Sequence, residues 1–342
     1  MATYKNRGTD AKPAWQARVR IVGYGTKTAS GFKTKKEAED WAAGVERPMR
    51  RRTYRDDAKA HQTTLLEALE RYEQEVTPAK KGAAEERYVL AAWRRDPLAL
   101  RSMASITASD VAEWRNRRMT TPRKLKDGTE RLPAPSTVAN AMNLLSAIFV
   151  HAASEWHMPS LNNPVAGVKR PKANAGRKRR LVGDEEGRLL TACKASEFNW
   201  LEAMVIIAIE TGMRQGELRA LIWQHINGPT AYLPDTKNGE PRTVPLSTRA
   251  RTAFAELRKL YPDAAEVFPF TKGEVIQAFK DACKAAEITG LTFHDLRHEA
   301  ATRLSKKLHN VLELSAVTGH KTLQTLKRYY QPDPEELAKR LD

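Results

Sequence analysis

The residues best suited to chemistry are five cationic side chains followed by a tyrosine, all in the second half of the chain. In chain order they are Arg214, Lys237, His294, Arg297, His320 and Tyr329. Guanidinium, ammonium and imidazole groups can bind a phosphate and neutralise the charge that builds on its oxygens in a transition state. A tyrosine hydroxyl beside them can attack phosphorus and hold the phosphate covalently. The set therefore predicts phosphoryl transfer through a covalent intermediate.

The spacing within the set agrees with a single phosphate site. His294 and Arg297 are three residues apart in the segment HDLRH, which places both side chains on one face of a helix. Glu217 follows Arg214 by three residues and is within its side-chain reach on a helix. Tyr330 is the alternative nucleophile, but neighbouring helical residues point about 100° apart, so the two tyrosines do not easily substitute for each other.

The same cations could activate the tyrosine without a metal ion. A free tyrosine hydroxyl has a pKa of about 10 and is a weak nucleophile at neutral pH. Fixed positive charge favours loss of the phenolic proton and stabilises the phosphoryl oxygens. The sequence contains no DxD or HxH ligand cluster. We therefore expect neither a metal ion nor another cofactor.

Composition points to a nucleic-acid partner. The chain has 342 residues and a formal net charge of +17, an excess typical of proteins that bind polyanions. A soluble protein that is merely basic is the alternative. The two cysteines, Cys193 and Cys283, form no CxxC motif, which fits a reducing cytosol. The N-terminus lacks the apolar core of a signal peptide, and we expect no membrane span and a cytoplasmic location.

The chain is expected to be mainly α with small β elements and to have several domains. A small sheet plus a helix, capped by Thr34, is expected in residues 1–55, with a basic tether at 47–55. The sheet includes an alternating strand over 15–22, in which Arg18 and Arg20 share one side. Residues 61–168 are expected to be helical, with a polar loop at 120–135 and a last helix that ends at Asn163-Pro164.

The remaining segments are a linker, a third block and a tail. Residues 169–180 are rich in Lys and Arg and contain no Asp or Glu, so they could cross DNA phosphates or act as a nuclear-localisation signal. Residues 181–331 are expected to be mostly helical, with one hairpin that turns at Asn238-Gly239. Residues 332–342 are expected to form a short terminal helix.

The third block resembles the catalytic domain of the tyrosine recombinases, the family of phage integrases. The resemblance rests on TGMRQGEL (211–218), DTKNG (235–239), HDLRH (294–298), Gly319-His320 and Tyr329, which follows His320 by nine residues. It implies that the two arginines bind the scissile phosphate and that His320 donates a hydrogen bond to it. His294 would donate a hydrogen bond to a non-bridging oxygen or help to shuttle a proton. It further implies that Lys237 is a general acid for the leaving 5′-hydroxyl. Glu217 and His298 would be supporting residues.

The resemblance also implies a reaction and partners. Attack by Tyr329 would leave a 3′-phosphotyrosyl link and a free 5′-hydroxyl, and a tetramer would exchange strands between two sites on double-stranded DNA. The first block resembles an arm-type DNA-binding domain, residues 61–168 resemble the core-binding domain, and a DNA-bending accessory protein is a further expected partner. The expected DNA-contacting residues are Arg18, Arg20, Arg177, Lys178, Arg179 and Arg180.

Four readings remain open from the sequence. An integrase of a prophage or integrative element is favoured by the arm-like first block. A DNA invertase or shufflon-type recombinase would use the same chemistry, as would a type IB topoisomerase acting as a monomer. A DNA-binding protein that no longer cuts is the alternative from another class, although the complete catalytic set argues against it.

Overall fold

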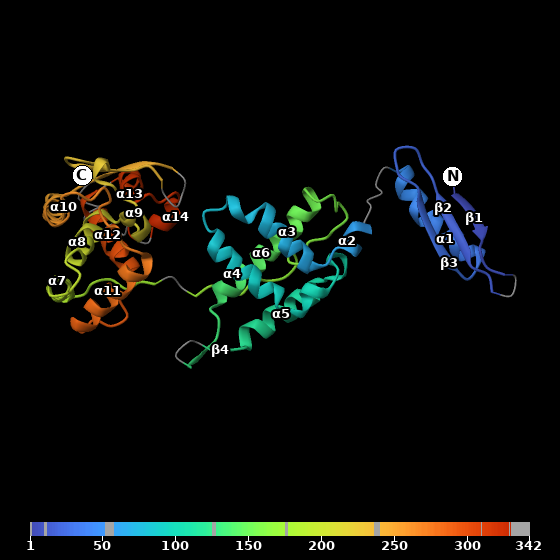
Figure 1. Ribbon diagram of the computed structural model, residues 1–342, viewed down its shortest axis with the longest axis horizontal. Helices are drawn as coiled ribbons and strands as arrows, with labels where there is room; N and C mark the ends of the chain where they lie inside the picture. Colours follow the sequence, from blue (N-terminus) through green and yellow to red (C-terminus); the bar gives the residue numbers. More distant parts are fainter. Residues whose placement is uncertain are drawn as a thin grey trace, which may run out of the picture. The chain divides into compact units, whose positions relative to one another are not determined.

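The computed structural model describes residues 2–9, 12–51, 58–124, 128–174, 177–235, 240–308, 310–327 and 329. The chain divides into two compact units, Met1–Ala175 and Gly176–Asp342. Buried apolar side chains form three separate cores, within residues 17–49, 60–168 and 189–317. Figure 1 draws the helices and strands that contribute to them. The fold class is mainly α with small antiparallel sheets, as expected. The three-domain division stays a proposal, which the three cores support.

The N-terminal segment is a three-stranded antiparallel sheet covered by one helix. Strands β1 (Ala2–Asn6), β2 (Trp15–Val19) and β3 (Lys27–Phe32) pair in that order, and α1 (Lys35–Arg50) packs on them. Thr34 caps α1 by accepting a 3.1 Å hydrogen bond from the Glu37 amide, as expected. Strand β1 is an addition to the elements expected from the sequence.

Two expectations for this segment were wrong. Strand β2 ends at Val19 rather than residue 22, because the chain turns there with the Tyr24 amide donating to the Ile21 carbonyl. Arg18 therefore lies in the strand and Arg20 beyond it, although both are exposed. Helix α1 continues to Arg50, so residues 47–50 of the expected tether are helical; residues 52–57 lie outside the described part.

Residues 58–168 form a helical bundle around an aromatic core. The helices are α2 (Ala58–Gln62), α3 (Leu65–Glu75), α4 (Ala83–Arg94), α5 (Ala108–Thr120) and α6 (Pro135–Ser154). The rings of Trp93 in α4 and Trp114 in α5 stack with centroids 4.0 Å apart. The expected polar loop contains a short hairpin instead, formed by β4 (Arg123–Lys124) and β5 (Glu130–Arg131).

Helix α6 is the apolar centre of this bundle. By length and composition it could cross a membrane; 33% of its apolar stretch is buried inside the protein, including Met142, Ile148 and Phe149 in the bundle core. The sequence analysis expected this helix to end at Asn163, before the proline, but it ends at Ser154. Trp156 is buried in the same core just past that end, and His157 after it has a φ of +58°, a left-handed conformation in which the helix cannot continue.

The C-terminal unit surrounds the buried helix α8 (Leu201–Thr211). Helices α7 (Glu185–Lys194), α10 (Thr248–Leu260), α11 (Lys272–Ala285) and α12 (Phe293–Lys307) pack around it. A sheet of β6 (Ile226–Asn227), β7 (Thr230–Leu233) and β8 (Arg242–Pro245) contains the expected hairpin. Short helices α9 (Gln215–Arg219), α13 (Val311–Thr318) and α14 (Leu323–Leu326) complete the unit. The hairpin turn at 236–239 and the tail at 332–342 lie outside the described residues.

Candidate active site

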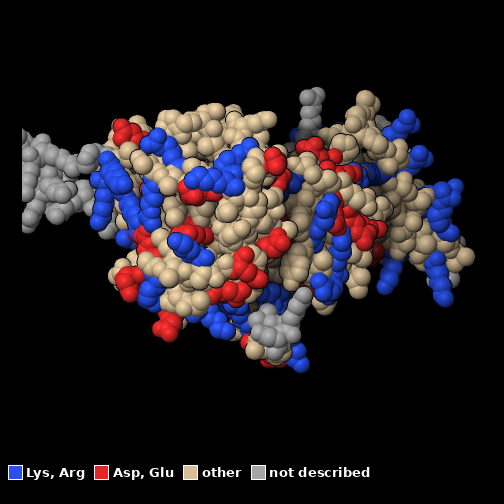
Figure 2. Space-filling view, turned by 60° about the vertical axis from the view of Figure 1, so that its left-hand side comes forward, with Lys and Arg blue, Asp and Glu red and all other residues tan. Residues whose placement is uncertain are grey.

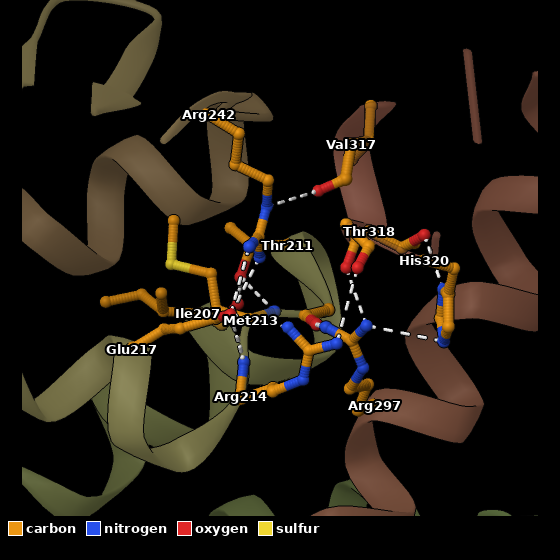
Figure 3. A network of polar contacts seen from close by, with 12 residues as sticks. Ile207, Thr211, Met213, Arg214, Glu217, Arg242, Arg297, Val317, Thr318 and His320 are labelled. Atoms are coloured by element: carbon orange, nitrogen blue, oxygen red, sulfur yellow. Dashed lines mark hydrogen bonds and ion pairs between the residues drawn. The ribbon is translucent and has the colours of Figure 1, made fainter. Parts of the chain in front are cut away.

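Three arginines converge on the C-terminal end of α13 (Figure 3). Arg242 Nε donates to the Val317 carbonyl at 3.2 Å, and Arg297 Nη2 donates to the Thr318 carbonyl at 2.6 Å. Arg214 Nη2 donates to the Gly319 carbonyl at 3.3 Å. The last carbonyls of a helix have no partner within the helix and carry partial negative charge. The end of α13 therefore holds three guanidinium groups together that would otherwise repel one another.

One glycine, Gly212, helps to place two of these arginines. Gly212 ends α8 with a φ of +63° and leads directly to Arg214 at the start of α9. Arg297 Nη1 donates to the Gly212 carbonyl at 2.5 Å, so this buried side chain joins the ends of α8 and α13. A left-handed glycine at a helix end is what allows the chain to turn there.

Glu217 neutralises part of this positive charge. Its carboxylate is buried and accepts from Arg242 Nη1 at 2.9 Å and Nη2 at 2.7 Å, a bidentate pair. It also accepts from the Arg214 amide at 2.8 Å and from Arg214 Nη1 at 2.7 Å. Burial alone would raise the pKa of Glu217, but the hydrogen bonds from Arg242 and Arg214 outweigh it and lower that pKa to about 2.

Arg297 keeps its charge despite burial. Burial and the nearby charge of Arg214 lower the pKa of Arg297 to about 10, which leaves the guanidinium protonated at neutral pH. In Figure 3, the Arg214 and Arg297 side chains reach into the same space from α9 and α12. The site thus combines three fixed guanidinium groups with one carboxylate, and its net positive charge suits a phosphodiester.

Contacts around His320 assign its neutral tautomer. The Thr318 hydroxyl donates to the Leu314 carbonyl at 2.6 Å, so it can only accept from His320 Nδ1, 2.7 Å away. The ring proton is therefore on Nδ1, and Nε2 accepts from Arg297 Nη2 at 3.3 Å. His320 is held at the edge of the arginine cluster, and its role in phosphate binding stays a prediction.

Tyr329 lies in the same site. Its hydroxyl is in hydrogen-bond contact with His298 Nδ1, and its ring centroid is 5.9 Å from that of His320. Its backbone carbonyl accepts from Ser305 Oγ at 2.8 Å. His298 and Ser305 are both on α12, two turns apart, so one helix fixes both ends of the tyrosine. Tyr330 lies outside the described residues.

Most of the expected catalytic residues meet in this site. Arg214, Arg297, His320 and Tyr329 are joined by the contacts above, and the exposed His294 packs its ring on His298 with centroids 5.3 Å apart. The expected Lys237 falls outside the described residues. Among the described residues, no cluster of three or more His, Cys, Asp or Glu could hold a metal ion.

The linker arginines contact carboxylates of their own unit. Arg177 pairs with Asp295 at 2.9 Å, Arg179 with Glu185 at 2.5 Å and Arg180 with Glu299 at 3.0 Å. On the face drawn in Figure 2, basic side chains are likewise interspersed with acidic ones. DNA phosphates would have to compete with these carboxylates, so the expected DNA contacts of the four residues 177–180 stay a prediction.

Sequence reasoning missed Arg242. It was assigned only to a hairpin strand, yet it binds Glu217 and is 10% exposed. One signal could have revealed it: Arg242 is two residues before the buried Val244 on the same strand, so its side chain faces the core. A charged side chain on that face of a strand requires a buried partner.

We expect Gly319→Ala to disrupt this arrangement. Gly319 has a φ of +68°, and a Cβ atom there would lie 2.7 Å from Arg242 Nη1. The left-handed backbone alone costs alanine about 1–2 kcal/mol. Urea unfolding should therefore show a loss of about 2 kcal/mol or more. Gly216→Ala is the matched control, because a Cβ there meets nothing within 4 Å and α9 tolerates alanine. Equal stability of the two variants would contradict the close packing of Arg242 on Gly319.

Comparisons with known proteins agree with this geometry. The Phage integrase family matches residues 179–336. A shufflon-specific DNA recombinase of Escherichia coli is 38% identical over 82% of this chain and 72% of its own length. A putative integrase/recombinase of Haemophilus influenzae is 33% identical over 94% of this chain and 86% of its own length.

Solved structures show the same fold. A lambda integrase (75–356) dimer bound to a COC′ core site has a TM-score of 0.65 and 23% identity, over 79% of this chain and 96% of that one. A lambda integrase tetramer bound to a Holliday junction has a TM-score of 0.62 and 22% identity, over 92% of this chain and 94% of that one. The two relatives and the family match show that this chain belongs to the phage integrase family of tyrosine recombinases.

Proposed function

We propose that this enzyme cuts and rejoins double-stranded DNA at specific sites through a 3′-phosphotyrosyl intermediate on Tyr329. The observation that carries this proposal is the position of the Tyr329 hydroxyl, in contact with His298 and beside the arginine cluster of the same chain. Attack on phosphorus forms the tyrosyl ester and breaks the bond to the 5′-oxygen. A 5′-hydroxyl from another strand reverses the step, so the bond energy is conserved without ATP.

Each side chain has a role in this proposal. Arg214 and Arg297 bind the non-bridging oxygens of the scissile phosphate, in place of part of their present contacts to the end of α13. His294 donates a hydrogen bond to the same oxygens, and Lys237 protonates the leaving 5′-oxygen. His320 donates to these oxygens through Nε2 once that nitrogen is protonated and gives up its present contact with Arg297 Nη2. Glu217 and Arg242 hold Arg214 and Arg297 in position and do not touch the phosphate.

DNA binding and assembly are also proposals. The net charge of +17 favours a DNA partner, and the structural neighbours include an integrase dimer on a core site and a tetramer on a Holliday junction. We propose that this chain likewise acts as a tetramer on two sites, with a DNA-bending protein as accessory partner. A bacterial cytoplasm, at the nucleoid, is the location that fits relatives from bacteria and their phages.

Integration into and excision from a chromosome is the outcome we propose, because the small N-terminal sheet and helix suit an arm-type DNA-binding domain. Inversion is the second candidate, favoured by the 38% identity to a shufflon-specific recombinase. Paired sites distinguish the two outcomes. An invertase recombines inverted sites within one molecule, whereas an integrase joins two different sites on separate molecules.

Covalent trapping tests the chemistry directly. A library of nicked duplexes from host or element DNA is incubated with the full chain, so that the short 5′-hydroxyl fragment diffuses away after cleavage. We expect an SDS-stable, protease-sensitive adduct whose peptide mass maps to Tyr329, and sequencing of the attached DNA gives the site. An adduct on Tyr330 would reassign the nucleophile. Salt-sensitive DNA binding without any adduct would favour a protein that no longer cuts.

A further inference from the structure

His298 is placed to take part in the reaction rather than only to support it. Its Nδ1 atom contacts the Tyr329 hydroxyl, the atom that attacks phosphorus in the proposed function. The two rings have centroids 5.7 Å apart and are inclined by 32°. The side chain is half-buried, one turn after the exposed His294 on α12. A group in contact with the reacting oxygen can exchange a proton with it directly.

The other groups near the tyrosine are less suited to accept this proton. Arg297 is protonated at neutral pH and can only donate, as can the Arg214 guanidinium. His320 already binds Thr318 through Nδ1 and Arg297 through Nε2, so both of its nitrogens are engaged. Of the histidines on α12, His294 contacts the ring of His298, whereas His298 contacts the phenol oxygen itself.

Helix α12 also fixes the distance over which the proton moves. Ser305 Oγ, two turns after His298, donates to the Tyr329 carbonyl at 2.8 Å. Helix α12 thus holds both the backbone carbonyl and the hydroxyl of Tyr329. The Thr302 hydroxyl donates to the His298 carbonyl at 2.9 Å within the same helix. Such preorganisation is what an efficient proton transfer requires.

We propose that His298 is the general base for Tyr329, an inference that rests on the proposed cleavage reaction. With its neutral ring protonated on Nε2, Nδ1 accepts the phenolic proton as the tyrosine oxygen bonds to phosphorus. The 5′-oxygen leaves with a proton from a separate acid, the proposed role of Lys237. In the rejoining step, the attacking 5′-hydroxyl returns its proton to that acid. The imidazolium of His298 then protonates the departing Tyr329 oxygen, so protons and bonds balance over the cycle.

The test compares His298→Asn with His294→Asn on a suicide duplex that carries the recovered site. Asparagine can keep a hydrogen bond to the tyrosine but cannot take its proton. We expect His298→Asn to bind DNA normally and to form adduct at least about 100-fold more slowly, within the range of general-base contributions. DNA binding and urea unfolding show that the variant is folded, and His298→Gln repeats the test if it is not.

Two chemical probes separate a base from a structural residue. A duplex with a 5′-bridging sulfur needs no leaving-group acid, so it should restore a Lys237→Ala variant but not His298→Asn. A fluorinated tyrosine at position 329 has a more acidic phenol and depends less on a base. It should recover a large part of the His298→Asn rate, about 10-fold or more, and leave the His294→Asn defect unchanged.

The outcomes are distinguishable. Rescue by the fluorinated tyrosine without rescue by sulfur would support the assignment. Three results would overturn the assignment of His298 as the base while the cleavage reaction stands. They are an equal rate loss of His298→Asn with natural and with fluorinated Tyr329, rescue of His298→Asn by the bridging sulfur, and an unimpaired His298→Asn variant. Absence of any adduct with the unchanged chain would overturn the proposed function, and this inference with it.

Discussion

Tyr329→Phe should reduce covalent adduct formation to below detection while DNA binding is unchanged. Phenylalanine keeps the ring beside His320 and His298 but removes the oxygen that would bond to phosphorus. The arginine cluster does not depend on this oxygen, because its contacts go to Glu217 and to the end of α13. The measurement is adduct yield on the suicide duplex, with affinity from a gel-shift titration at fixed salt.

Tyr330→Phe is the matched control for this prediction. The two tyrosines are adjacent, so both variants remove one hydroxyl from the same short segment. We expect Tyr330→Phe to form adduct within a few-fold of the unchanged chain. A reversal of the two results would make Tyr330 the nucleophile. Loss of DNA binding in Tyr329→Phe would indicate that the tyrosine is structural.

Several helix starts were predictable because they depend on local chemistry, whereas β1 and the β4–β5 hairpin were not expected. Thr34 and Thr64 each accept from the amide three residues later, and the sequence shows a side chain of this capping type before each helix. Helix ends were less predictable. A proline indicated the end of α6 at Asn163, whereas the helix ends at Ser154, before the left-handed His157.

The meeting of several candidate catalytic residues in one site was predictable for a different reason. Arg214, His294, Arg297 and Tyr329 belong to short segments whose residue types are unusual together, so the sequence itself indicates a phosphate site. Their supporting contacts were not predictable. Arg242 is 25 residues from Glu217, and nothing local in the hairpin indicates which carboxylate it binds. A contact between distant segments depends on the packing of the whole unit.

The basic linker illustrates the same limit. Its sequence predicts a run of positive charge that could cross DNA phosphates, yet Arg177 and Arg180 bind Asp295 and Glu299, two buried carboxylates on α12. Burial raises the pKa of Asp295, but hydrogen bonds from Arg177 and Thr292 outweigh it and lower that pKa. Charge counted along a sequence therefore overstates what is available to DNA, because the partners of each charge are set by the fold.

Glu217→Gln should be the most destabilising conservative substitution in the active site. The neutral amide cannot compensate the positive charges of Arg242 and Arg214, whose side chains are only 10% and 19% exposed. Removing one partner of a buried ion pair costs about 3–5 kcal/mol. We expect a loss of that size in urea unfolding at neutral pH, together with loss of cleavage, because both arginines would lose the acceptor that orients them.

The pH dependence of this loss identifies its cause. The pKa of Glu217 is about 2 in the folded protein against an ordinary value of 4.5, so its stabilisation is complete above pH 4.5 and disappears as the pH falls toward 2. The difference in the free energy of unfolding between the unchanged chain and Glu217→Gln should therefore be constant from pH 7 to 5 and become smaller below pH 4.5.

Glu313→Gln on α13 is the control, because the exposed Glu313 should change stability by less than about 0.5 kcal/mol. A gap for Glu217→Gln that did not change with pH would mean that lost packing, rather than lost charge, destabilises the variant. In that case the arginines would be held mainly by the end of α13. Glu217 would then be dispensable for keeping them in register with Tyr329.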